Sequence, residues 1–480
     1  MHDGLLSLQH EGGQPVYSFR HALLRDAAYQ SLLERDRRAL HASIAAVLQS
    51  QFAGLCASQP GLLALHQEQA GQVAEALAGW ERAARHAAAR SAQQEAIVHL
   101  RRALALLDRA PDQPGRDATE LRLQLMLAGR LMASAGYGAT PVQAVYERAL
   151  ALAGTIGDAA ALHKVRLGLE GWHFMRGDFS RAQAIADDMA AGLGDAPDPL
   201  AHIQARWARA NLLFHRGQVA PALALTEAVL ADYHALPRRP QAVQDPGVIG
   251  LCYAAWAHWA LGDPDRALQR AQDALALADR LDHAFGIGQA LGFLAVVHHF
   301  RGETEAGLGA AQRAIAVCEA GGFAQWLAHA LVLHGRLRVA QGDVDAGLAE
   351  MARGHAMWAD TGAAVTLPFY LALRAEGLAA AGRPDEALPL LAEAQALITR
   401  HGERHHEAEV RRLTGELLWA AGHGADAAEA WLQGALAVAH ELQLPGLARR
   451  SAATLAQLWL AQGRLADAQA LQARTGCTPT

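Results

Sequence analysis

The sequence contains almost no lysine. Lys164 is the single lysine among 42 basic residues, so arginine carries nearly all of the positive charge. A phosphate-binding loop of the form GxxxxGK[ST] needs a lysine directly after a glycine, and Lys164 follows His163 instead. Schiff-base chemistry would also depend on this one residue. The sequence therefore excludes a Walker-type nucleotide site within these 480 residues.

Cysteines and long apolar runs are also scarce. No two of the four cysteines have zinc-site or redox-motif spacing, which predicts reduced thiols in a cytoplasmic protein; they are Cys56, Cys252, Cys318 and Cys477. No apolar run reaches the ~18 residues of a membrane-spanning helix. The opening segment MHDGLLSLQH lacks the basic-then-apolar order of a secretory signal. We expect a cytoplasmic location and no membrane partner.

Charge and composition limit the class of protein further. A formal net charge of −6 provides no basic field for nucleic acid or anionic lipid. Hydrophobic residues make up 52% of the chain and aromatic residues only 6%, so most of the apolar content is alanine and leucine. These residues favour helices. A chain of 480 residues is also longer than a usual single domain, which indicates several domains or a repeat array.

A short turn motif recurs through the last three fifths of the chain. RGDFSRAQ at 176–183, LGDPDRAL at 261–268 and QGDVDAGL at 341–348 are three of its eight copies. Each copy contains a glycine, and successive glycines are 40, 45, 40, 40, 40, 40 and 41 residues apart. The glycines are Gly177, Gly217, Gly262, Gly302, Gly342, Gly382, Gly422 and Gly463. A constant period of this length is the signature of a helical repeat protein.

Small residues flank each turn at matched positions. The glycine can adopt a positive φ after one helix, and the polar residue that follows can start the next. Five residues later stand Ala182, Ala222, Ala267, Gly307, Gly347, Ala387, Ala427 and Ala468. Seven residues before it stand Glu170, Ala210, Ala255, Ala295, Gly335, Ala375, Gly415 and Ala456, of which only the first is large. This pattern predicts antiparallel helix pairs of the tetratricopeptide (TPR) type.

The predicted fold is all-α, a right-handed TPR-like superhelix of helical hairpins. The N-terminal stretch differs, because LLSLQ and VYSF around EGGQP predict a β-hairpin. A helix is expected from there to about Leu48, with a break near Glu34–Asp36. A hairpin with such a helix is what the end of a winged-helix domain would contribute. The predicted parts are a winged-helix remnant at 1–50, irregular hairpins at 51–175, regular repeats at 176–473 and a tail at 474–480.

Several segments resemble a known family. They include YSFRHALLRDAAYQSLL (17–33), QDPGVIGLCYAAWAHWALGDPDRAL (244–268) and GERHHEAEVRRLTGELLWAAG (402–422). The chain resembles the C-terminal half of bacterial STAND-type predicted ATPases with TPR-like repeats, many of which are fused to a class III adenylate/guanylate cyclase domain. The resemblance implies a signalling switch whose ATPase module is absent here. We therefore expect a truncated or separately encoded piece, with an upstream ATPase or cyclase module as a possible partner.

The resemblance also suggests a role for His21. Residues 19–26, which contain Phe19-Arg20-His21, resemble a winged-helix motif whose histidine approaches the phosphates of a bound nucleotide. His21 would then be a cofactor-binding residue, but only together with the missing ATPase module. The alternative is that His21 caps or packs against the start of its helix. Without a phosphate cradle it cannot hold a nucleotide by itself.

The 24 histidines do not form a recognisable metal motif. His405 and His406 are adjacent, so their side chains point about 100° apart on a helix and share one ion poorly. Glu403, Glu407 and Glu409 surround them, but no HExxH order is present. We interpret this segment as a solvated helix start. We expect no metal, no cofactor and no catalytic residue.

Aromatic and histidine side chains gather before three of the repeat glycines. Such positions belong to the first helix of each pair, which lines the concave surface of a solenoid. The predicted groove residues are Trp172, Tyr253, Trp256, Trp259, Phe293, His298 and His299. The alternative is that most of these aromatics fill space between helices. If the groove interpretation holds, Trp256→Ala should abolish partner capture without unfolding the array.

The leading hypothesis is a non-enzymatic sensor or interaction scaffold. Such a module would bind a protein, peptide or small-molecule ligand in the concave groove and would not contact nucleic acid. Two alternatives remain open at this stage. The chain could be a subunit that completes a separately encoded ATPase or adenylate cyclase, or a gene fragment without independent function.

Overall fold

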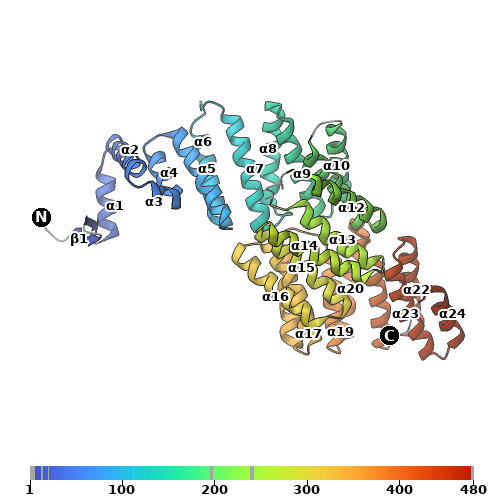
Figure 1. Cartoon of the computed structure of the whole chain (residues 1–480). Coiled ribbons are helices and arrows are strands. Elements are labelled where there is room, and N and C mark those ends of the chain that lie inside the picture. Colours follow the sequence, from blue (N-terminus) through green and yellow to red (C-terminus); the bar gives the residue numbers. More distant parts are fainter. Residues whose placement is uncertain are drawn as a thin grey trace. The chain divides into compact units, whose positions relative to one another are not determined.

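The computed structural model describes residues 6–11, 14–19, 21–111, 113–194, 198–237 and 243–476. The chain forms two compact units, 1–90 with 94–123 and 91–93 with 124–480. The predicted fold class is confirmed: the protein is all-α, with sequential helical hairpins in a TPR-like superhelix (Figure 1). Arg20, Cys477 and the rest of the predicted tail after Gly476 lie outside the described residues.

The first unit begins with a two-stranded antiparallel hairpin. Strand β1 (Leu6–Glu11) pairs with β2 (Gln14–Phe19), and Leu6 lies opposite Phe19. The helices that follow are α1 (Ala22–Ser31), α2 (Glu34–Gln51), α3 (Ala53–Ser58), α4 (Pro60–Gln69), α5 (Val73–Ala89) and α6 (Gln93–Asp108). The break expected near Glu34–Asp36 falls at Leu32 and Leu33, between α1 and α2.

The second unit contains the regular repeats. Helix α7 (Arg116–Ala135) begins in the first unit and ends in the second. The first half then contains α8 (Thr140–Ile156), α9 (Ala159–Met175), α10 (Phe179–Leu193), α11 (Pro199–His215), α12 (Val219–Ala235), α13 (Pro246–Ala260), α14 (Pro264–Arg280), α15 (Ala284–Arg301) and α16 (Thr304–Gly321). The second half contains α17 (Ala324–Ala340), α18 (Val344–Asp360), α19 (Leu367–Ala380), α20 (Pro384–His401), α21 (Glu407–Ala420), α22 (Ala425–Glu441), α23 (Pro445–Ala461) and α24 (Leu465–Thr475).

The repeat glycines separate the two helices of each pair. All eight have a positive φ, from +72° at Gly382 to +96° at Gly342, a conformation that a side chain disfavours. Aspartate caps several of the helices that follow a turn: the side chains of Asp178 and Asp263 accept hydrogen bonds from backbone N–H groups in the first turns of α10 and α14. These caps satisfy donors that would otherwise lack a partner.

The small residues predicted on both sides of each turn are buried, with one exception. Ala182 and Ala210, for example, are almost inaccessible to solvent, which lets successive helices cross closely. Ala427 is exposed, and Ala428 occupies the crossing position instead. The cause is a longer turn, in which a second glycine with positive φ, Gly424, delays the start of α22 by one residue.

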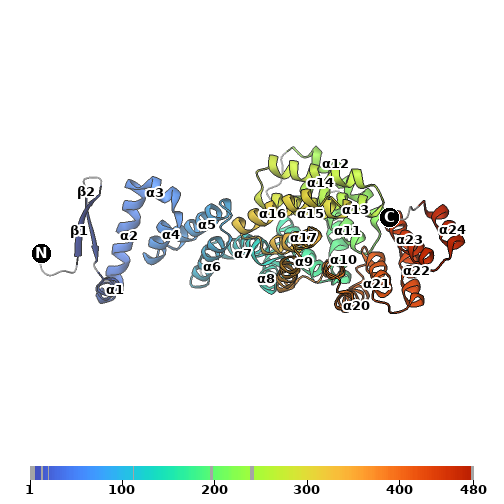
Figure 2. The same cartoon turned by 90° about the horizontal axis from the view of Figure 1, so that it is seen from below.

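Successive turns of the superhelix touch each other. The backbone N–H of Tyr137 donates to Gln325 Oε1 at 3.0 Å, and Arg449 donates to the carbonyl of Gly262 at 3.1 Å. These partners are 188 and 187 residues apart, fewer than five repeats of 40 residues. Helix α13 consequently contacts α23, which Figure 2 shows beside it. The inner surface is therefore closed into separate cavities rather than left as one open groove.

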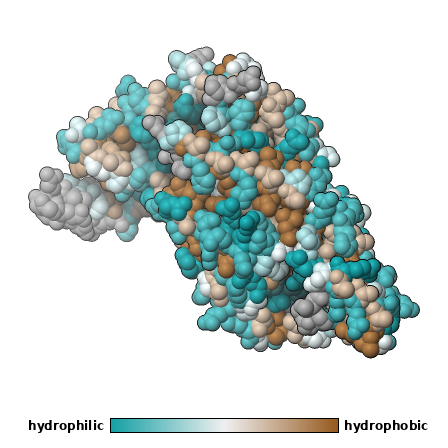
Figure 3. Space-filling model, turned by 45° about the vertical axis from the view of Figure 1, so that its right-hand side comes forward, coloured by the Kyte–Doolittle hydropathy of each residue, from teal (hydrophilic) through white to brown (hydrophobic). Residues whose placement is uncertain are grey.

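Most hydrophobic residues point inward. On the face shown in Figure 3, hydrophilic residues cover much of the surface and hydrophobic ones form smaller areas between them. Within the described residues, no helix combines the length and the hydrophobicity that a membrane crossing requires.

Candidate functional site

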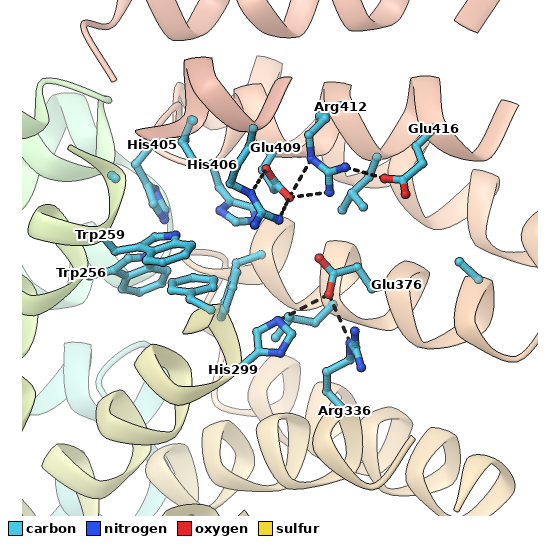
Figure 4. Close-up of a pocket in the computed structure, with 18 of the residues that line it drawn as sticks. Trp256, Trp259, His299, Arg336, Glu376, His405, His406, Glu409, Arg412 and Glu416 are labelled. Carbon is cyan, nitrogen blue, oxygen red and sulfur yellow. Dashed lines mark hydrogen bonds and ion pairs between the residues drawn. The ribbon is translucent and has the colours of Figure 1, made fainter. Parts of the chain in front are cut away.

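A cavity of about 560 Å³, here called the charged cavity, lies on the inner face of the second unit. It is formed mainly by α13, α15, α17, α19, α21 and α23, which are the first helices of six consecutive hairpins. The 40-residue repeat places equivalent positions of these helices side by side. Ion pairs from several helices face one another across the cavity (Figure 4).

The lower ion cluster is centred on Glu376 of α19. The Nε atom of Arg336 on α17 donates to Glu376 Oε2 at 3.1 Å, and His299 Nε2 on α15 lies 3.4 Å from the same oxygen. Burial alone would raise the pKa of Glu376, but the interactions with His299 and Arg336 lower this pKa to about 2. Glu376 is therefore an ionised carboxylate at neutral pH.

The upper ion cluster is centred on Glu409 of α21. Arg412 Nη2 and Arg450 Nη2 donate to Glu409 Oε1 at 2.7 Å and 2.9 Å, and Arg412 also pairs with Glu416. Burial opposes ionisation of Glu409, but the two guanidinium groups hold its pKa well below the usual value. Glu409 and Arg412 are buried, whereas Arg450 is exposed. Of these three residues, Arg450 is therefore the one that solvent reaches.

An aromatic edge completes the charged cavity. Trp259 of α13 is partly buried and stacks on Phe300, with ring centroids 4.9 Å apart and planes 10° apart. The guanidinium of Arg450 lies 5.9 Å from the Trp259 ring centroid. An indole beside a cluster of arginines and glutamates provides both apolar and charged contacts, which is typical of the anchors of an interaction site.

A buried polar cluster forms part of the wall where two superhelical turns meet. His215 Nδ1 lies 3.2 Å from Glu403 Oε1, and His215 Nε2 lies 3.0 Å from the hydroxyl of Tyr253. Glu403 also accepts a hydrogen bond from the backbone N–H of Thr366 at 3.0 Å. Burial lowers the pKa of His215 to about 3 and raises the pKa of Glu403, so it favours the neutral form of both groups. The cluster links residues 188 positions apart.

The same cluster contains the residues that could hold a metal ion. Among the described residues, His215, Glu403 and His405 bring their ligand atoms within 4.8 Å of one another. Two imidazoles and a carboxylate are donors that Zn²⁺ and Fe²⁺ accept. His405 converges with His215 rather than with its neighbour His406, and both His405 and His406 lie in the turn before α21 rather than on a helix.

Our interpretation of residues 403–409 as a solvated helix start was wrong. The segment is polar enough for a surface, but the next superhelical turn covers it. Backbone N–H groups of Arg404 and His405 donate to the carbonyl of His215, at 2.7 Å and 3.3 Å. All the acidic and histidine side chains of the segment are buried, with exposed fractions of 2% for Glu403, 3% for His405, 6% for His406, 5% for Glu407 and 4% for Glu409.

A second cavity of about 310 Å³, here called the aromatic cavity, lies on the opposite side of Trp256. It is lined from α7, α8, α9, α11, α13, α15, α17, α18 and α19, and ten of the thirty described residues that line it are aromatic. Trp256 contributes to both cavities. The centroid of its ring lies 5.8 Å, 5.0 Å and 5.2 Å from those of Phe293, Phe369 and His405. Trp256 is therefore the core of the wall between the two cavities.

The seven predicted groove residues are divided between these places. Trp256, Trp259 and His299 line the charged cavity, whereas Tyr253, Trp256 and Phe293 line the aromatic cavity. Two others line neither cavity: Trp172 donates to the carbonyl of Ala139 at 3.2 Å, and His298 pairs with Glu303 at 2.7 Å. Trp172, Trp256 and Phe293 are buried, which is the space-filling alternative considered for these side chains.

His21 lies in the first unit. It occupies the N-cap position of α1, is exposed, and makes no side-chain capping hydrogen bond. Its backbone carbonyl accepts from Leu24 and Arg25. The side chain therefore does not cap its helix, and its orientation leaves it open to solvent.

The inward-facing charged residues were missed in the sequence. Arg336, Glu376 and Glu416 each stand six residues before a repeat glycine, so opposite charges recur at one repeat position. This spacing of 40 residues is the signal that could have identified Arg336 and Glu376 as neighbours. It becomes interpretable only when the face of the helix that points inward is known.

No protein-family model matches the chain. The uncharacterized protein R02095 of Rhizobium meliloti (strain 1021) is 26% identical over 303 residues, which cover 61% of this chain and 29% of that protein. The chain thus spans less than a third of the length of this relative. The similarity supports common descent of the aligned part and assigns no activity.

The fold resembles that of a solved structure. A Rap protein complexed with Competence and Sporulation Factor is 15% identical with a TM-score of 0.53, over 78% of this chain and 99% of that chain. The STAND protein PH0952 from Pyrococcus horikoshii, which has a tetratricopeptide repeat sensor, is 13% identical with a TM-score of 0.40, over 95% and 64%. The first similarity establishes a TPR-like repeat fold; the second score is too low to support a conclusion.

Proposed function

We propose that this chain is a non-enzymatic sensor and interaction module that binds a peptide or protein segment in the charged cavity of its second unit. The observation that carries the proposal is the pairing of an accessible arginine, Arg450, with a partly buried tryptophan, Trp259, at the edge of a cavity of about 560 Å³. Cavities of roughly 300–1,000 Å³ are the usual size for small-ligand recognition.

The charges of this cavity suit a peptide because they have both signs. A peptide segment presents carbonyl oxygens, N–H groups and side chains of either charge. Arg450 and Arg336 can donate to carbonyl or carboxylate oxygens, and Glu416 can accept from N–H groups. The Rap protein with a similar fold was solved in complex with Competence and Sporulation Factor. That likeness suggests the class of ligand, and the residues above define where it would bind.

The experiment selects peptides from a random displayed library on the full-length protein. Selected peptides are synthesised with a fluorescent label and titrated against the wild type and against Trp259→Ala and Arg450→Ala. Loss of a central aromatic or arginine anchor costs about 2 kcal/mol or more, so each variant should bind at least tenfold more weakly.

Trp431→Ala is the matched control. Trp431 is also partly buried and beside an arginine, with Arg411 5.8 Å from its ring centroid, but it lies on the outer helix α22. Its variant should bind the peptides as the wild type does. The proposed site would be refuted by peptides that bind Trp259→Ala and Arg450→Ala as tightly as they bind the control Trp431→Ala. A library that yields no binding peptide would also refute it.

The family resemblance extends the proposal to a STAND-type regulator with a separate ATPase or cyclase module. The first unit supports this second role. Ten of the fifteen exposed large hydrophobic side chains in the described residues lie between Tyr17 and Leu55, and many exposed apolar side chains in one segment are typical of a region that a partner covers. In the complete regulator, His21 would face the nucleotide. Calorimetry should detect no ATP binding by this chain alone, and micromolar binding would contradict a non-enzymatic role.

A further inference from the structure

The aromatic cavity has features that the proposed peptide site does not require. It lies on the other side of Trp256, and among the described residues it shares Trp256 alone, and none of the ion clusters, with the charged cavity. One third of its lining is aromatic, compared with 6% of the chain. The exposed Lys164 is also part of the lining, so the cavity reaches the protein surface. The aromatic residues include Tyr137, Trp207, Tyr253, Phe293, Trp326 and Tyr370.

Several polar atoms in this lining are buried and make no hydrogen bond within the described part of the chain. Buried polar atoms are nearly always paired, because each unpaired one costs about 1–3 kcal/mol. The hydroxyl of Tyr370 in the same lining is paired, for instance, and lies 2.6 Å from His329 Nδ1. The unpaired atoms are available to a ligand. They are Tyr137 Oη, Glu170 Oε1, Asn211 Oδ1 and Trp326 Nε1.

Glu170 is the most unusual of these residues. It stands seven residues before a repeat glycine, where the other seven repeats have alanine or glycine, and its side chain is only 5% exposed. Among the described residues that line the aromatic cavity, it is also the only acidic one. A large ionisable side chain at a crossing position opposes the close approach of two helices, and Glu170 lines a cavity whose described lining is one third aromatic. Packing alone gives no reason for this residue.

We propose that the aromatic cavity is the binding site of a small organic amine, with the ammonium group on Glu170 and the apolar body between the aromatic rings. The unpaired oxygens of Tyr137, Glu170 and Asn211 can accept hydrogen bonds, and an ammonium group has three donors. The faces of aromatic rings attract cations by about 0.5–2 kcal/mol each and repel anions. An anionic ligand is disfavoured by the faces of the rings. This site is independent of the proposed peptide site.

Proton release accompanies this binding. Burial raises the pKa of Glu170 to about 8 in the empty cavity, so the carboxyl group must lose its proton when it pairs with an ammonium ion. Burial also raises the pKa of the four tyrosines in the lining and lowers that of His329 to about 4, so these five groups stay neutral. Six other described residues that line the cavity have titratable side chains. They are Tyr137 in the connection before α8, Tyr146 on α8, Lys164 on α9, Tyr253 on α13, His329 on α17 and Tyr370 on α19.

The helices packed on α9 place no further charge in the cavity. On α8 and α10 the charged side chains are exposed, and α11 contributes only uncharged residues to the lining. The proton released on binding is therefore the one on Glu170. The exposed residues are Glu147 and Arg148 of α8 and Arg181, Asp187 and Asp188 of α10.

The test compares three probes of similar size on the full-length protein: 2-phenylethylamine, 2-phenylethanol and 3-phenylpropionate. Isothermal titration calorimetry at pH 8 should show the amine binding at least tenfold more tightly than the alcohol, and no binding of the carboxylate. Between pH 6 and pH 7 the amine affinity should rise about tenfold, because one proton is released. The affinity of the alcohol should stay constant over this range.

Glu170→Gln should lower the affinity for the amine at least tenfold, abolish its pH dependence and leave the affinity for the alcohol within twofold. Glu416→Gln, in the charged cavity, is the matched control and should change none of these values. Should Glu170→Gln not fold, Asn211→Leu and the wild-type pH profile test the same site, because Asn211→Leu should weaken the amine severalfold. An alcohol that binds as tightly as the amine, an amine affinity independent of pH, or no amine binding at millimolar concentration would overturn the proposal.

Discussion

The two cavities of the second unit are lined from several of the same inner helices and share Trp256, but they differ in whether their buried polar groups have partners. In the charged cavity, Glu376 and Glu409 are each held by two basic side chains. In the aromatic cavity, one oxygen of Glu170 has no hydrogen-bond partner among the residues that the structure describes. A satisfied network stabilises the fold in the absence of a ligand, whereas an unsatisfied one costs stability until a ligand binds. Under the two proposals above, the charged cavity would be formed before its peptide binds, whereas the aromatic cavity would gain stability only when its ligand binds.

The largest expected effect concerns the unpaired carboxyl group of the aromatic cavity. Because folding raises the pKa of Glu170 from 4.5 to about 8, its contribution to stability is fully present below pH 4.5 and is lost as the pH rises through 8. From pH 4.5 to pH 8 the free energy of unfolding of the wild type should therefore fall by about 4 kcal/mol more than that of Glu170→Gln. Thermal unfolding of both proteins at pH 4.5 and pH 8 measures the difference. If Glu170→Gln is less stable than the wild type at pH 8 but not at pH 4.5, the Glu170 carboxylate is ionised and paired in the folded protein, and the prediction is wrong.

A slightly smaller effect is expected when a partner is removed from the charged cavity. Arg412→Met takes the buried guanidinium from Glu409 and leaves a carboxylate with only the exposed Arg450. Loss of one partner of a buried pair costs about 3–5 kcal/mol, so the free energy of unfolding should fall by about 3 kcal/mol in urea titrations. Arg266→Met, which removes an exposed pair with Asp263 on α14, should cost less than about 1 kcal/mol. Equal effects of the two substitutions would show that burial does not matter here.

The smallest effect concerns a contact between superhelical turns, that of Gly362 with Gly138. Gly362 and Gly342 have similar positive φ angles, +74° and +96°. A Cβ atom on Gly362 would lie 2.5 Å from the carbonyl oxygen of Gly138, whereas Gly342 faces open space. Gly342→Ala should lower the free energy of unfolding by about 1–2 kcal/mol because of its backbone conformation. Gly362→Ala should lower it by about 1–2 kcal/mol more, because the new Cβ atom also clashes with Gly138. Identical denaturation curves for the two variants would argue against contact between the turns.

The local structure was predictable from the sequence. Each repeat glycine needs only its own turn and adjacent helices, and its positive φ follows from the absence of a side chain. The hairpin around EGGQP and the helix break near Glu34 are equally local, and both form close to where they were expected. The extra residue before α22 was not anticipated, because Gly422 and Gly424 offer two places for one helix to begin.

The candidate site was only partly predictable. The inner helices were identified, and Trp259 and His299 were named as groove residues, but the arginines and glutamates that pair across the cavity were not. Trp256 was proposed as an anchor and is the buried partition between two cavities instead. Residues 403–409 were assigned to solvent because their composition is that of a surface.

Sequence alone was enough to define the helical hairpin, its period of about 40 residues and the glycine at its turn, because these depend on interactions within one or two repeats. The folded chain was needed to show that Tyr137 meets Gln325 and that His215 meets Glu403, 188 residues away in each case. Small rotations between neighbouring hairpins accumulate over nearly five repeats before these side chains approach one another. That accumulated curvature buries the polar segment at Glu403, divides the inner surface into two cavities, and places Glu170 in the lining of the aromatic cavity.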